Sequence, residues 1–488
     1  MQRFSTPTNQ TIKPRRVIVI GGGLAGLSAA QTLARNYGQH VLVTVLESRR
    51  ITGGRVGSFF DPGSKMTVDY CQHVAMGCCV NFIDFLKQCG LEEDWRVSSR
   101  LNFSHREHGL FCIKPWKWLP APFHQLPLLW QLPFLSASQR REVQYAMLRL
   151  SRLQIDPAMK EVTAAQWLSG HGQSHKTIED FWNVFSYSAL GDHVDCVSIG
   201  SLRQLFIQGF AAHCDAADLW IPKKPLSDIF GTKLVEYLRS IGVRIRHGAS
   251  VTKLESMGKG CRVVTRDGEC LEGDHVVCAV PWHEINKLTD DLDGLSYLRD
   301  AASTPTSSIT GIHLWFDRPL GDLDHVVGIG TAIQWIFKPC YDASNETQEL
   351  TEDVGTHVFY YQVVISGSQQ WASLEKKSLV RLVTDEIRRM VPVAKKARLV
   401  HSRVVTDQRA VIVPHPDVEK KRPRSTTPLP YLHLAGDWIA TGWPSTMEGA
   451  VISGRQAVAS IAKREEWPIR GDVIAQSRSF LSRTILKK

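Results

Sequence analysis

Near its start the chain reads Arg16-Val-Ile-Val-Ile20-Gly21-Gly-Gly23-Leu-Ala-Gly26, and the small-residue segment 27–34 follows directly. The apolar run predicts a buried strand, and glycines spaced Gly-x-Gly-x-x-Gly predict a tight turn that opens a helix. Such a turn lets backbone N–H groups at a helix N-terminus approach a pyrophosphate, where the helix dipole favours negative charge. The stretch therefore predicts a dinucleotide-binding unit of strand, turn and helix.

Two features downstream support this prediction. A second apolar stretch, Val41–Leu46, predicts a strand that ends in Glu47, whose carboxylate is placed to accept from a ribose hydroxyl. A second glycine cluster, Gly53-Gly54-Arg55, follows this strand. The glycine motif alone would be weak evidence, but its place between a strand and a helix favours a dinucleotide site over a structural glycine turn.

Composition bounds the class of protein. A chain of 488 residues exceeds what one hydrophobic core usually serves, so we expect two domains, interleaved in sequence. Hydrophobic residues at 43% and charged residues at 22% are typical of globular proteins. The 11 cysteines form no C-x-x-C pair, so we expect free thiols in a reducing cytosol, no disulfide framework and no metal site.

Charge and end segments bear on location and partners. The polar N-terminus, Met1–Thr8, lacks the apolar core of a signal peptide, and no stretch is long and apolar enough to span a bilayer. The net charge of +10 and the pI near 9.0 permit attraction to nucleic acid or to an anionic membrane. No basic run interleaved with aromatics marks a nucleic-acid path, so a membrane is favoured, and simple solubility is the open alternative. We expect a cytoplasmic protein, free or peripheral at the inner membrane face.

Patterning predicts an α/β architecture of interleaved domains. A Rossmann-type domain with a parallel sheet, discontinuous in sequence, is predicted for residues 15–100, 231–285 and 395–465. A membrane-facing α+β substrate domain is predicted for residues 101–230 and 286–394. Helical patterns cover 136–155 and 160–190, with Thr163 as a helix cap, and residues 466–488 form a C-terminal tail.

Segment 111–135 contains five prolines among tryptophans and leucines, so it forms no long regular helix and leaves a large apolar surface. Five of its residues fit a rim at which an apolar ligand enters from a bilayer: Trp116, Lys117, Trp118, Phe123 and Trp130. The basic end of the chain, residues 478–488, is a candidate amphipathic anchor. Two alternatives stay open, namely that segment 115–135 simply covers the core and that the tail is a frayed helix.

A second cofactor element lies near the C-terminus. Residues 434–454 read Leu-Ala-Gly-Asp437-Trp-Ile-Ala-Thr-Gly-Trp-Pro-Ser-Thr-Met447-Glu448-Gly-Ala-Val-Ile-Ser-Gly, which predicts a strand, a loop and a helix start. Asp437 at the strand end can bind polyol hydroxyls, and N–H groups near Met447 and Glu448 form a helix N-terminus. A reduced flavin carries negative charge at N1–C2=O, which such a terminus stabilises. Together with the first glycine loop, this element points to FAD rather than NAD.

These motifs resemble the flavin amine oxidase and phytoene desaturase superfamily, on the segments Gly21–Gly26, Ile51–Phe59 and Leu434–Gly454. More narrowly, four segments resemble the hydroxysqualene dehydroxylase family, the squalene-associated FAD-dependent desaturases of hopanoid pathways: Asp69–Val74, Trp118–His124, Pro133–Ser136 and Asp218–Ser227. The resemblance covers about residues 15–460, nearly the whole chain.

The resemblance implies a noncovalent FAD and assigns its contacts. It places the pyrophosphate at Gly21, Gly23 and Gly26, the ribose at Glu47, the phosphate–ribityl region at Arg55, adenine at Val251, the ribityl chain at Asp437 and the isoalloxazine edge at Met447. The predicted site is completed by Leu24, Ala25, Gly53, Gly54, Gly436, Thr446 and Glu448. An ordinary core valine is the alternative for Val251. In one departure from the family pattern, Cys71 stands at a position that is usually glycine, which leaves the backbone before His73 in question.

The implied reaction removes the hydroxyl of hydroxysqualene by hydride transfer from reduced flavin, giving squalene. A hydrophobic isoprenoid is then the substrate, and the electron donor is not identified by the sequence. His73 or a nearby carboxyl is the predicted general acid, with a histidine that only orients a loop as the alternative. Trp438 and Trp443 are predicted to line the tunnel, although such residues more often serve packing.

Three rival functions stay open. A carotenoid desaturase uses the same fold to remove hydride from an allylic C–H. A flavin amine oxidase typically carries an aromatic residue immediately before Met-Glu-Gly-Ala, where this chain has Thr446. A non-enzymatic membrane adaptor would have no chromophore, and intact glycine loops at both ends of the chain argue against it.

Overall fold

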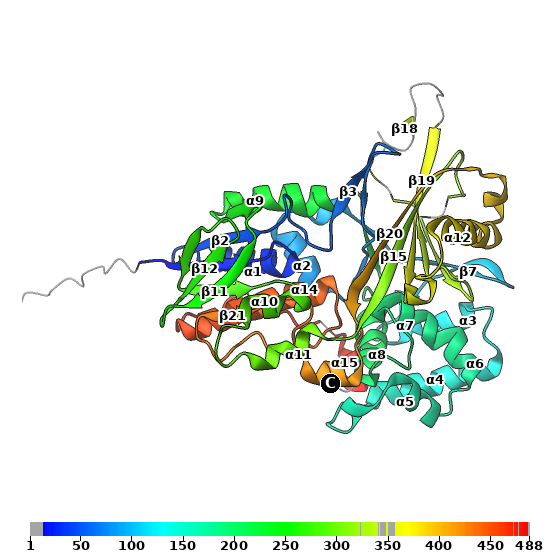
Figure 1. The fold of residues 1–488 in the computed structure, drawn as a ribbon. Helices are drawn as coiled ribbons and strands as arrows, with labels where there is room; N and C mark the ends of the chain where they lie inside the picture. Colours follow the sequence, from blue (N-terminus) through cyan, green and yellow to red (C-terminus); the bar gives the residue numbers. More distant parts are fainter. Residues whose placement is uncertain are drawn as a thin grey trace, which may run out of the picture.

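The computed structural model consists of two parts, one built on a parallel sheet and one on a long mixed sheet (Figure 1). It describes residues 13–322, 324–339, 341, 348–349, 357–471, 473–476 and 478–486. The N-terminal segment Met1–Thr8 and the tail residues Lys487 and Lys488, which entered the sequence predictions, lie outside the described residues.

The first part is built on a five-stranded parallel sheet with the order β10-β2-β1-β14-β21. Its strands are β1 (Arg15–Ile20), β2 (Val41–Glu47), β10 (Arg244–His247), β14 (His275–Cys278) and β21 (Leu432–Leu434). The central strands β1 and β14 are apolar runs, because helices or a second sheet cover both faces of a parallel sheet. These strands come from three distant stretches of the chain, which confirms the predicted Rossmann-type fold with a discontinuous sheet.

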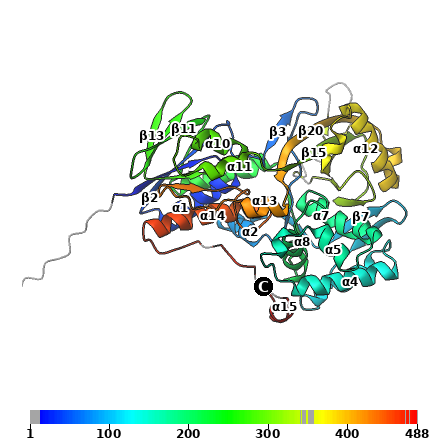
Figure 2. The ribbon, with the colours of Figure 1, turned by 60° about the horizontal axis from the view of Figure 1, so that its bottom comes forward.

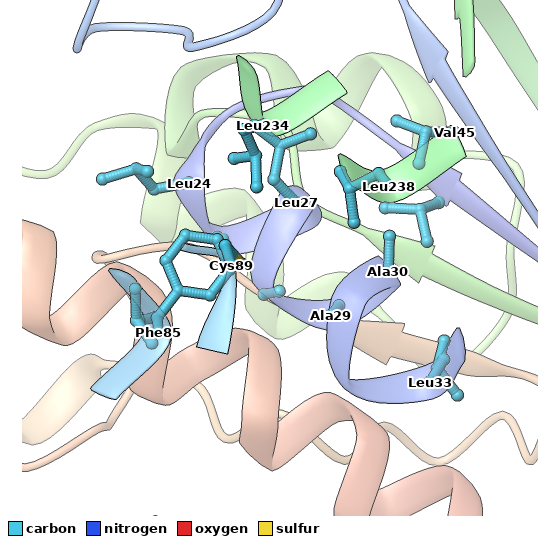
Figure 3. Close-up of a cluster of buried hydrophobic side chains, with 14 of the residues drawn as sticks. Leu24, Leu27, Ala29, Ala30, Leu33, Val45, Phe85, Cys89, Leu234 and Leu238 are labelled. Carbon is cyan, nitrogen blue, oxygen red and sulfur yellow. The ribbon is translucent and has the colours of Figure 1, made fainter. Parts of the chain in front are cut away.

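Four helices pack on one face of this sheet. They are α1 (Leu24–Tyr37), α2 (Val80–Gln88), α9 (Leu234–Ser240) and α14 (Met447–Arg464). Figure 3 shows part of the core beneath them, where Leu27 of α1 lies beside Leu234 and Leu238 of α9. Helices α1 and α14 approach very closely, because a Cβ added at Gly454 would lie 2.4 Å from the carbonyl oxygen of Ala25.

The opposite face carries a small antiparallel sheet and two short helices. The strands are β11 (Val251–Ser256), β12 (Cys261–Thr265) and β13 (Cys270–Gly273), and the helices are α10 (Ile285–Thr289) and α11 (Arg299–Ala302). A hairpin of β3 (Ser58–Asp61) and β4 (Met66–Asp69) extends toward the second part (Figure 1). A three-stranded sheet adds β5 (Ala75–Met76), β6 (Trp95–Ser98) and β9 (Leu219–Pro222).

The second part is built on an eight-stranded mixed sheet with the order β20-β15-β19-β17-β16-β7-β8, and β18 pairs with β19. Its strands are β7 (Leu101–His105), β8 (Gly109–Ile113), β15 (Thr306–Phe316), β16 (His325–Ile329), β17 (Trp335–Phe337), β18 (Gln348–Glu349), β19 (His357–Ser366) and β20 (Leu399–Ile412). Helix α12 (Lys376–Met390) packs on it. Strand β20 falls inside the predicted range 395–465 yet pairs with β15, so the chain rejoins the first sheet only after Ile412.

A group of helices packs beside this sheet around one apolar core. Its main members are α4 (Ala137–Arg152), α5 (Ala164–Gly170), α7 (Asn183–Leu190), α8 (Ile199–Phe206) and the π-helical turns η4 (Ile178–Trp182) and η5 (Ile207–Ala211). Thr163 caps α5 as predicted, since its Oγ1 accepts from the N–H of Gln166 at 3.2 Å. The pattern over 160–190 does not form one helix, because α5 ends before Gly172, whose φ of 71° is left-handed.

After β8 ends at Ile113, the proline-rich segment forms only the short helices η2 (Phe123–Gln125) and α3 (Leu128–Gln131), as the prolines predict. Two further short α-helices are α6 (His175–Thr177) and α13 (Pro416–Lys421). After α14 the chain runs along α2 to the helical group and ends in α15 (Phe480–Ile485), as Figure 2 shows. Leu486 is buried in the core of the helical group, so this end of the tail is packed and not frayed.

Three observations concern the residues that the structure describes. No helix there is both long enough and apolar enough to cross a bilayer. No group of three or more His, Cys, Asp or Glu side chains there is arranged to bind a metal ion. The cysteines in those ranges are free thiols.

Candidate active site

A cavity of about 1080 Å³ lies between the two parts of the molecule. One end is lined by the glycine loops and by the segments that follow β2, β14 and β21, and we call it the cofactor end. The other end, the apolar limb, is lined by side chains of the second part, chiefly Leu101, Phe103, Phe185, Leu205, Phe210 and Trp335. One continuous space therefore joins a dinucleotide-type site to a hydrocarbon-lined channel.

The first glycine loop has the geometry that a pyrophosphate needs. Gly23 precedes α1 without a side-chain cap, so the N–H groups of the first helical turn remain available to a ligand in the cavity. A Cβ added at Gly26 would lie 2.0 Å from the carbonyl oxygen of Gly21, so the turn closes only with glycine there. A Cβ at Gly23 would meet no atom within 4 Å, which leaves open space for a phosphate. Leu24 and Ala25 line the same wall.

Glu47 lies at the end of β2 with its carboxylate held by backbone donors. Its Oε2 accepts from the N–H of Gly22 at 2.7 Å, and its Oε1 accepts from the N–H of Arg49 at 2.8 Å. These bonds hold the carboxylate at the cavity wall, on the same stretch of wall as Val251 of β11. The structure thus brings together the two residues predicted for ribose and adenine.

Arg55 joins the second glycine cluster to the C-terminal element. Its guanidinium is paired with the buried carboxylate of Asp437 and donates to the carbonyl oxygen of Ala410 at 2.7 Å. The same group lies over the ring of Trp282, 5.4 Å from the centroid. Gly53 and the other residues of this cluster also line the cavity. Residues 382 positions apart are therefore held together at the cofactor end.

The C-terminal element forms the predicted helix start. Helix α14 begins at Met447, and the hydroxyl of Thr446 caps it by accepting from the N–H of Gly449 at 3.2 Å. Gly436 donates its N–H to the hydroxyl of Ser453 at 2.8 Å, which fixes the loop that carries Asp437. Gly436, Asp437, Thr446, Met447 and Glu448 all line the cavity. The positive end of the α14 dipole is thus directed at the cofactor end.

The side chain of Glu448 serves a different helix. Its carboxylate is fully buried and accepts from the N–H of Phe82 at 2.7 Å and from Asn81 at the start of α2. Burial raises the pKa of Glu448, and the bonds from Asn81 and Phe82 oppose this shift. The carboxylate therefore caps α2.

His73 lies in the cavity wall with its ring orientation fixed. Its Nδ1–H donates to the carbonyl oxygen of Cys71 at 2.8 Å. Cys71, which stands where the family usually has glycine, therefore holds the His73 ring through its backbone. Burial lowers the pKa of His73; the bond to Cys71 opposes this shift and the nearby Arg55 cation adds to it. Neutral imidazole therefore predominates near neutral pH.

Tryptophans near the C-terminal element have different surroundings. Trp438 is buried in the core of the first part, and its Nε1–H donates to the carbonyl oxygen of Val280 at 3.0 Å. Trp443 follows in the loop before α14. Both residues line the cavity, as the sequence predicts. Packing is the main role of Trp438, because almost all of its surface is enclosed.

Sequence reasoning missed several polar residues around the cavity. Gln72 and Ser188 line it, and a lone glutamine or serine gives no spacing signal. The position of Gln72 directly before His73 was the one available pointer. Behind the wall, the fully buried Asp69 accepts from the hydroxyls of Ser58 at 2.6 Å and Tyr341 at 3.2 Å. Burial raises the pKa of Asp69 to about 7, although these bonds oppose the shift.

Except for Gly26, which shapes the first turn without lining the cavity, the predicted cofactor residues thus surround one space that suits a flavin dinucleotide. It offers an uncapped helix start with room for phosphates, a fixed carboxylate for a ribose, and a second helix start directed at the same space. The arrangement calls for a cofactor that extends between two ends of the chain. The role of each residue in binding remains a prediction.

Comparisons with known proteins agree with this arrangement. The chain is 24% identical over 448 residues to the hydroxysqualene dehydroxylase of Zymomonas mobilis, covering 90% of this chain and 97% of that protein. It is 23% identical over 476 residues to a 15-cis-phytoene desaturase from an Oncidium hybrid cultivar, covering 92% and 78%. The fold resembles that of an oxidoreductase from Methanosarcina mazei with a TM-score of 0.67, at 17% identity, covering 92% and 100%.

The family is decided by a match over most of the chain. The model of the flavin containing amine oxidoreductases matches residues 24–462, which include both cofactor elements and the sheets between them. Its members are described as flavin-containing, which agrees with the cofactor assigned to the cavity. The chain therefore belongs to the flavin containing amine oxidoreductase family and is an FAD-dependent oxidoreductase.

Proposed function

We propose that this protein removes the hydroxyl group of hydroxysqualene reductively and releases squalene. The observation that carries the proposal is the continuity of the cavity, in which a flavin site opens directly onto a hydrocarbon-lined limb. The Zymomonas mobilis relative is named for this dehydroxylation and matches along nearly its whole length.

The apolar limb suits a long hydrocarbon chain. Aromatic side chains dominate it, and Phe185 and Phe210 lie edge to face with centroids 5.5 Å apart. Trp335 and Phe337 stack at 5.2 Å on the sheet side. Such a wall gives the hydrophobic effect a large area over which to hold an isoprenoid, while it offers few hydrogen bonds to a polar substrate.

The chemistry balances with one hydride and one proton. The carbon–oxygen bond of the alcohol breaks, a carbon–hydrogen bond forms, and the oxygen leaves as water. A reduced flavin, which the glycine loops, Arg55 and Asp437 would hold at the cofactor end, would supply the hydride, and an external donor would restore its two electrons. Hydroxide is a poor leaving group, so the protein must deliver a proton to the departing oxygen. His73 is our candidate for the donor of that proton, because the residue lines the cavity.

A carotenoid desaturase is the second candidate, and the similarity to the Oncidium phytoene desaturase favours it. The same apolar limb would then hold a polyene precursor, and hydride would move in the opposite direction. An amine oxidase is less well supported. Thr446 occupies the place of an aromatic wall, and its hydroxyl is used to cap α14.

We also propose that the protein takes its substrate from a membrane surface at segment 115–135. Trp118 and Trp130 are 75% and 67% exposed, an unusual state for such large apolar side chains. Gln125 of the same segment donates to the carbonyl oxygen of Phe210 at 3.0 Å, and Phe210 lines the apolar limb. The segment that carries the exposed aromatics is therefore in contact with the wall of the apolar limb.

The C-terminal helix adds to the same surface. Ser479 donates its hydroxyl to the carbonyl oxygen of Ala121 at 2.7 Å, and Phe480 is 83% exposed beside it. Lys117 is bound to Asp215 at 2.8 Å and Asp218 at 2.6 Å, so its charge is partly neutralised. The proposed membrane contact rests mainly on aromatic side chains. On this proposal the protein is cytoplasmic and peripheral.

Product analysis after anaerobic mixing tests the proposed reaction. Photoreduced holoenzyme is mixed with hydroxysqualene in detergent, and in a parallel experiment oxidised holoenzyme is mixed with phytoene. We expect squalene in the first mixture together with reoxidation of the flavin. A coloured polyene in the second mixture, with no squalene in the first, would replace this proposal by the desaturase.

A further inference from the structure

Two residues that line the cavity, Gln72 and Ser188, each carry a buried polar atom, Oε1 and Oγ respectively, that lacks a hydrogen-bond partner among the described residues. A third such atom, Nδ1 of His283, belongs to the segment after β14 at the cofactor end. Native proteins pair nearly all of their buried polar atoms. An unpaired atom in the wall of a cavity therefore marks a place where a bound polar group completes the bond.

Gln72 lines the cavity and is mostly enclosed by protein. The residue is 7% exposed, and its amide nitrogen donates only a long bond of 3.5 Å to the carbonyl oxygen of His73. Its carbonyl oxygen is an acceptor without a donor in the described part of the chain. A ligand hydroxyl supplies such a donor. The site lies next to the histidine that we consider for proton delivery.

Ser188 lies on α7, opposite the C-terminal element. It lines the large cavity and also a small adjoining pocket of about 90 Å³, to which Ser366 and Ser445 contribute. A water molecule needs about 10–15 Å³ of such space and two or more polar partners. The small pocket therefore has both the room and the polar groups to take up water.

We infer that Gln72 and Ser188 recognise an oxygen function on the isoprenoid, and that the small pocket beside Ser188 receives this oxygen when it leaves as water. The inference rests on the proposed function and adds to it the residues that select an alcohol. A hydroxyl both donates and accepts, so it can pair with the acceptor Gln72 Oε1 or with the Ser188 hydroxyl. A pure hydrocarbon leaves both atoms unpaired.

The test compares binding of hydroxysqualene and squalene to oxidised holoenzyme, delivered in the same detergent micelles and followed by the flavin absorption spectrum. The variants are Gln72→Leu and Ser188→Ala, which remove the polar atoms and keep an apolar wall. Val184→Ala is the matched control, since Val184 lines the cavity one turn before Ser188 on α7. Thermal unfolding of each holoenzyme identifies any variant that misfolds.

We expect wild-type protein to prefer the alcohol. In at least one polar variant, the ratio of the squalene to the hydroxysqualene dissociation constant should fall about three- to tenfold. The fall should come from weaker binding of hydroxysqualene, while the affinity for squalene stays unchanged. Val184→Ala should weaken the binding of hydroxysqualene and of squalene to the same extent, because it removes only apolar contact. An unchanged ratio in both folded polar variants, or no preference in the wild type, would overturn the inference.

Failure of the inference and failure of the proposed function give different results. If wild-type protein converts hydroxysqualene to squalene while both polar variants keep the binding ratio, the function stands and the recognition residues are wrong. If no conversion occurs but the alcohol preference is present and is lost in a polar variant, the recognition residues stand and the substrate is another oxygenated isoprenoid.

Discussion

The carboxylate of Glu448 accepts two hydrogen bonds from Asn81, one from its backbone N–H at 3.1 Å and one from its side-chain amide at 2.8 Å. Asn81 in turn accepts from the N–H of Ile474 at 2.8 Å and donates to its carbonyl oxygen at 3.0 Å. The start of α14, the start of α2 and the C-terminal tail are thus joined in one hydrogen-bonded network. The helix N-terminus at the cofactor end is held by contacts far from it in sequence.

Replacing Glu448 by alanine should therefore destabilise the holoenzyme as well as weaken FAD binding. The N–H groups of Asn81 and Phe82 would stay buried without an acceptor, which costs about 2–4 kcal/mol in total. The measurement is the thermal midpoint together with the FAD dissociation constant. Glu448→Gln keeps one acceptor and should lose less, while Glu236→Ala on the exposed side of α9 serves as control. Equal midpoints for Glu448→Ala and Glu236→Ala would contradict the assigned role.

The two glycines of the first loop should respond differently to alanine. At Gly26 the new methyl would collide with the carbonyl oxygen of Gly21, so Gly26→Ala should lower the thermal midpoint of the apoprotein by several degrees. At Gly23 the backbone has an ordinary φ of −79° and open space around the Cβ. Gly23→Ala should leave the apoprotein unchanged and raise the FAD dissociation constant at least about tenfold, because its methyl stands where the phosphates approach. Tight FAD binding by a folded Gly23→Ala protein would show that the pyrophosphate lies elsewhere.

A feature of this site can be predicted from the sequence when the residues that form it are neighbours along the chain. The glycine loop and the start of α14 follow from local backbone geometry, so the turn at Gly21 and Gly26 and the helix start near Met447 could be predicted from the sequence. The role of the Glu448 carboxylate could not, because its partner lies 367 positions away and only packing brings them together.

The same limit explains the other differences. Hydrophobic periodicity gave helices over 160–190 but not the break near Gly172, whose left-handed backbone ends α5. The lack of a hydrogen-bond partner for Ser188 Oγ among the described residues depends on the residues packed around it, so the sequence pattern of α7 does not predict it. The exposed aromatics of segment 115–135 were identified because five prolines exclude a buried helix there.

If His73 delivers the proton, the rate of flavin reoxidation by hydroxysqualene should rise as the pH falls. Only the imidazolium form donates, and the pKa of His73 is lowered by burial below its ordinary value of 6.5, so this form gains population on the acid side of neutrality. Stopped-flow measurements between pH 5 and about 8 should show this rise in wild-type protein and a flat profile in His73→Ala. Identical profiles for the two proteins would remove His73 from the mechanism.

Asp69 should make stability depend on pH in a defined window. Its pKa of about 7 in the folded protein lies above the ordinary 3.8, so the folded state holds a proton that the unfolded state releases. Stability is therefore greatest below about pH 4 for this group and is lost as the pH rises to about 7. Asp69→Asn mimics the protonated form and should remove this pH dependence. At neutral pH the variant should therefore be more stable than the wild type by about 2–4 kcal/mol in the free energy of unfolding. Parallel denaturation midpoints of the two proteins from pH 4 to about 8 would contradict the assignment.

The exposed tryptophans allow a direct test of membrane contact. Trp116 and Trp118 stack with centroids 5.6 Å apart, and Trp118 and Trp130 expose most of their surface. The double variant Trp118→Ser, Trp130→Ser should sediment with anionic vesicles at least about tenfold less than the wild type, because it removes two large apolar groups from the contact. Tyr145→Ser is the matched control, since Tyr145 is 45% exposed on α4 outside the segment. High salt should weaken binding only modestly, because Lys117 is already paired with Asp215 and Asp218. Equal sedimentation of the double variant and the control would exclude these aromatics as the membrane contact.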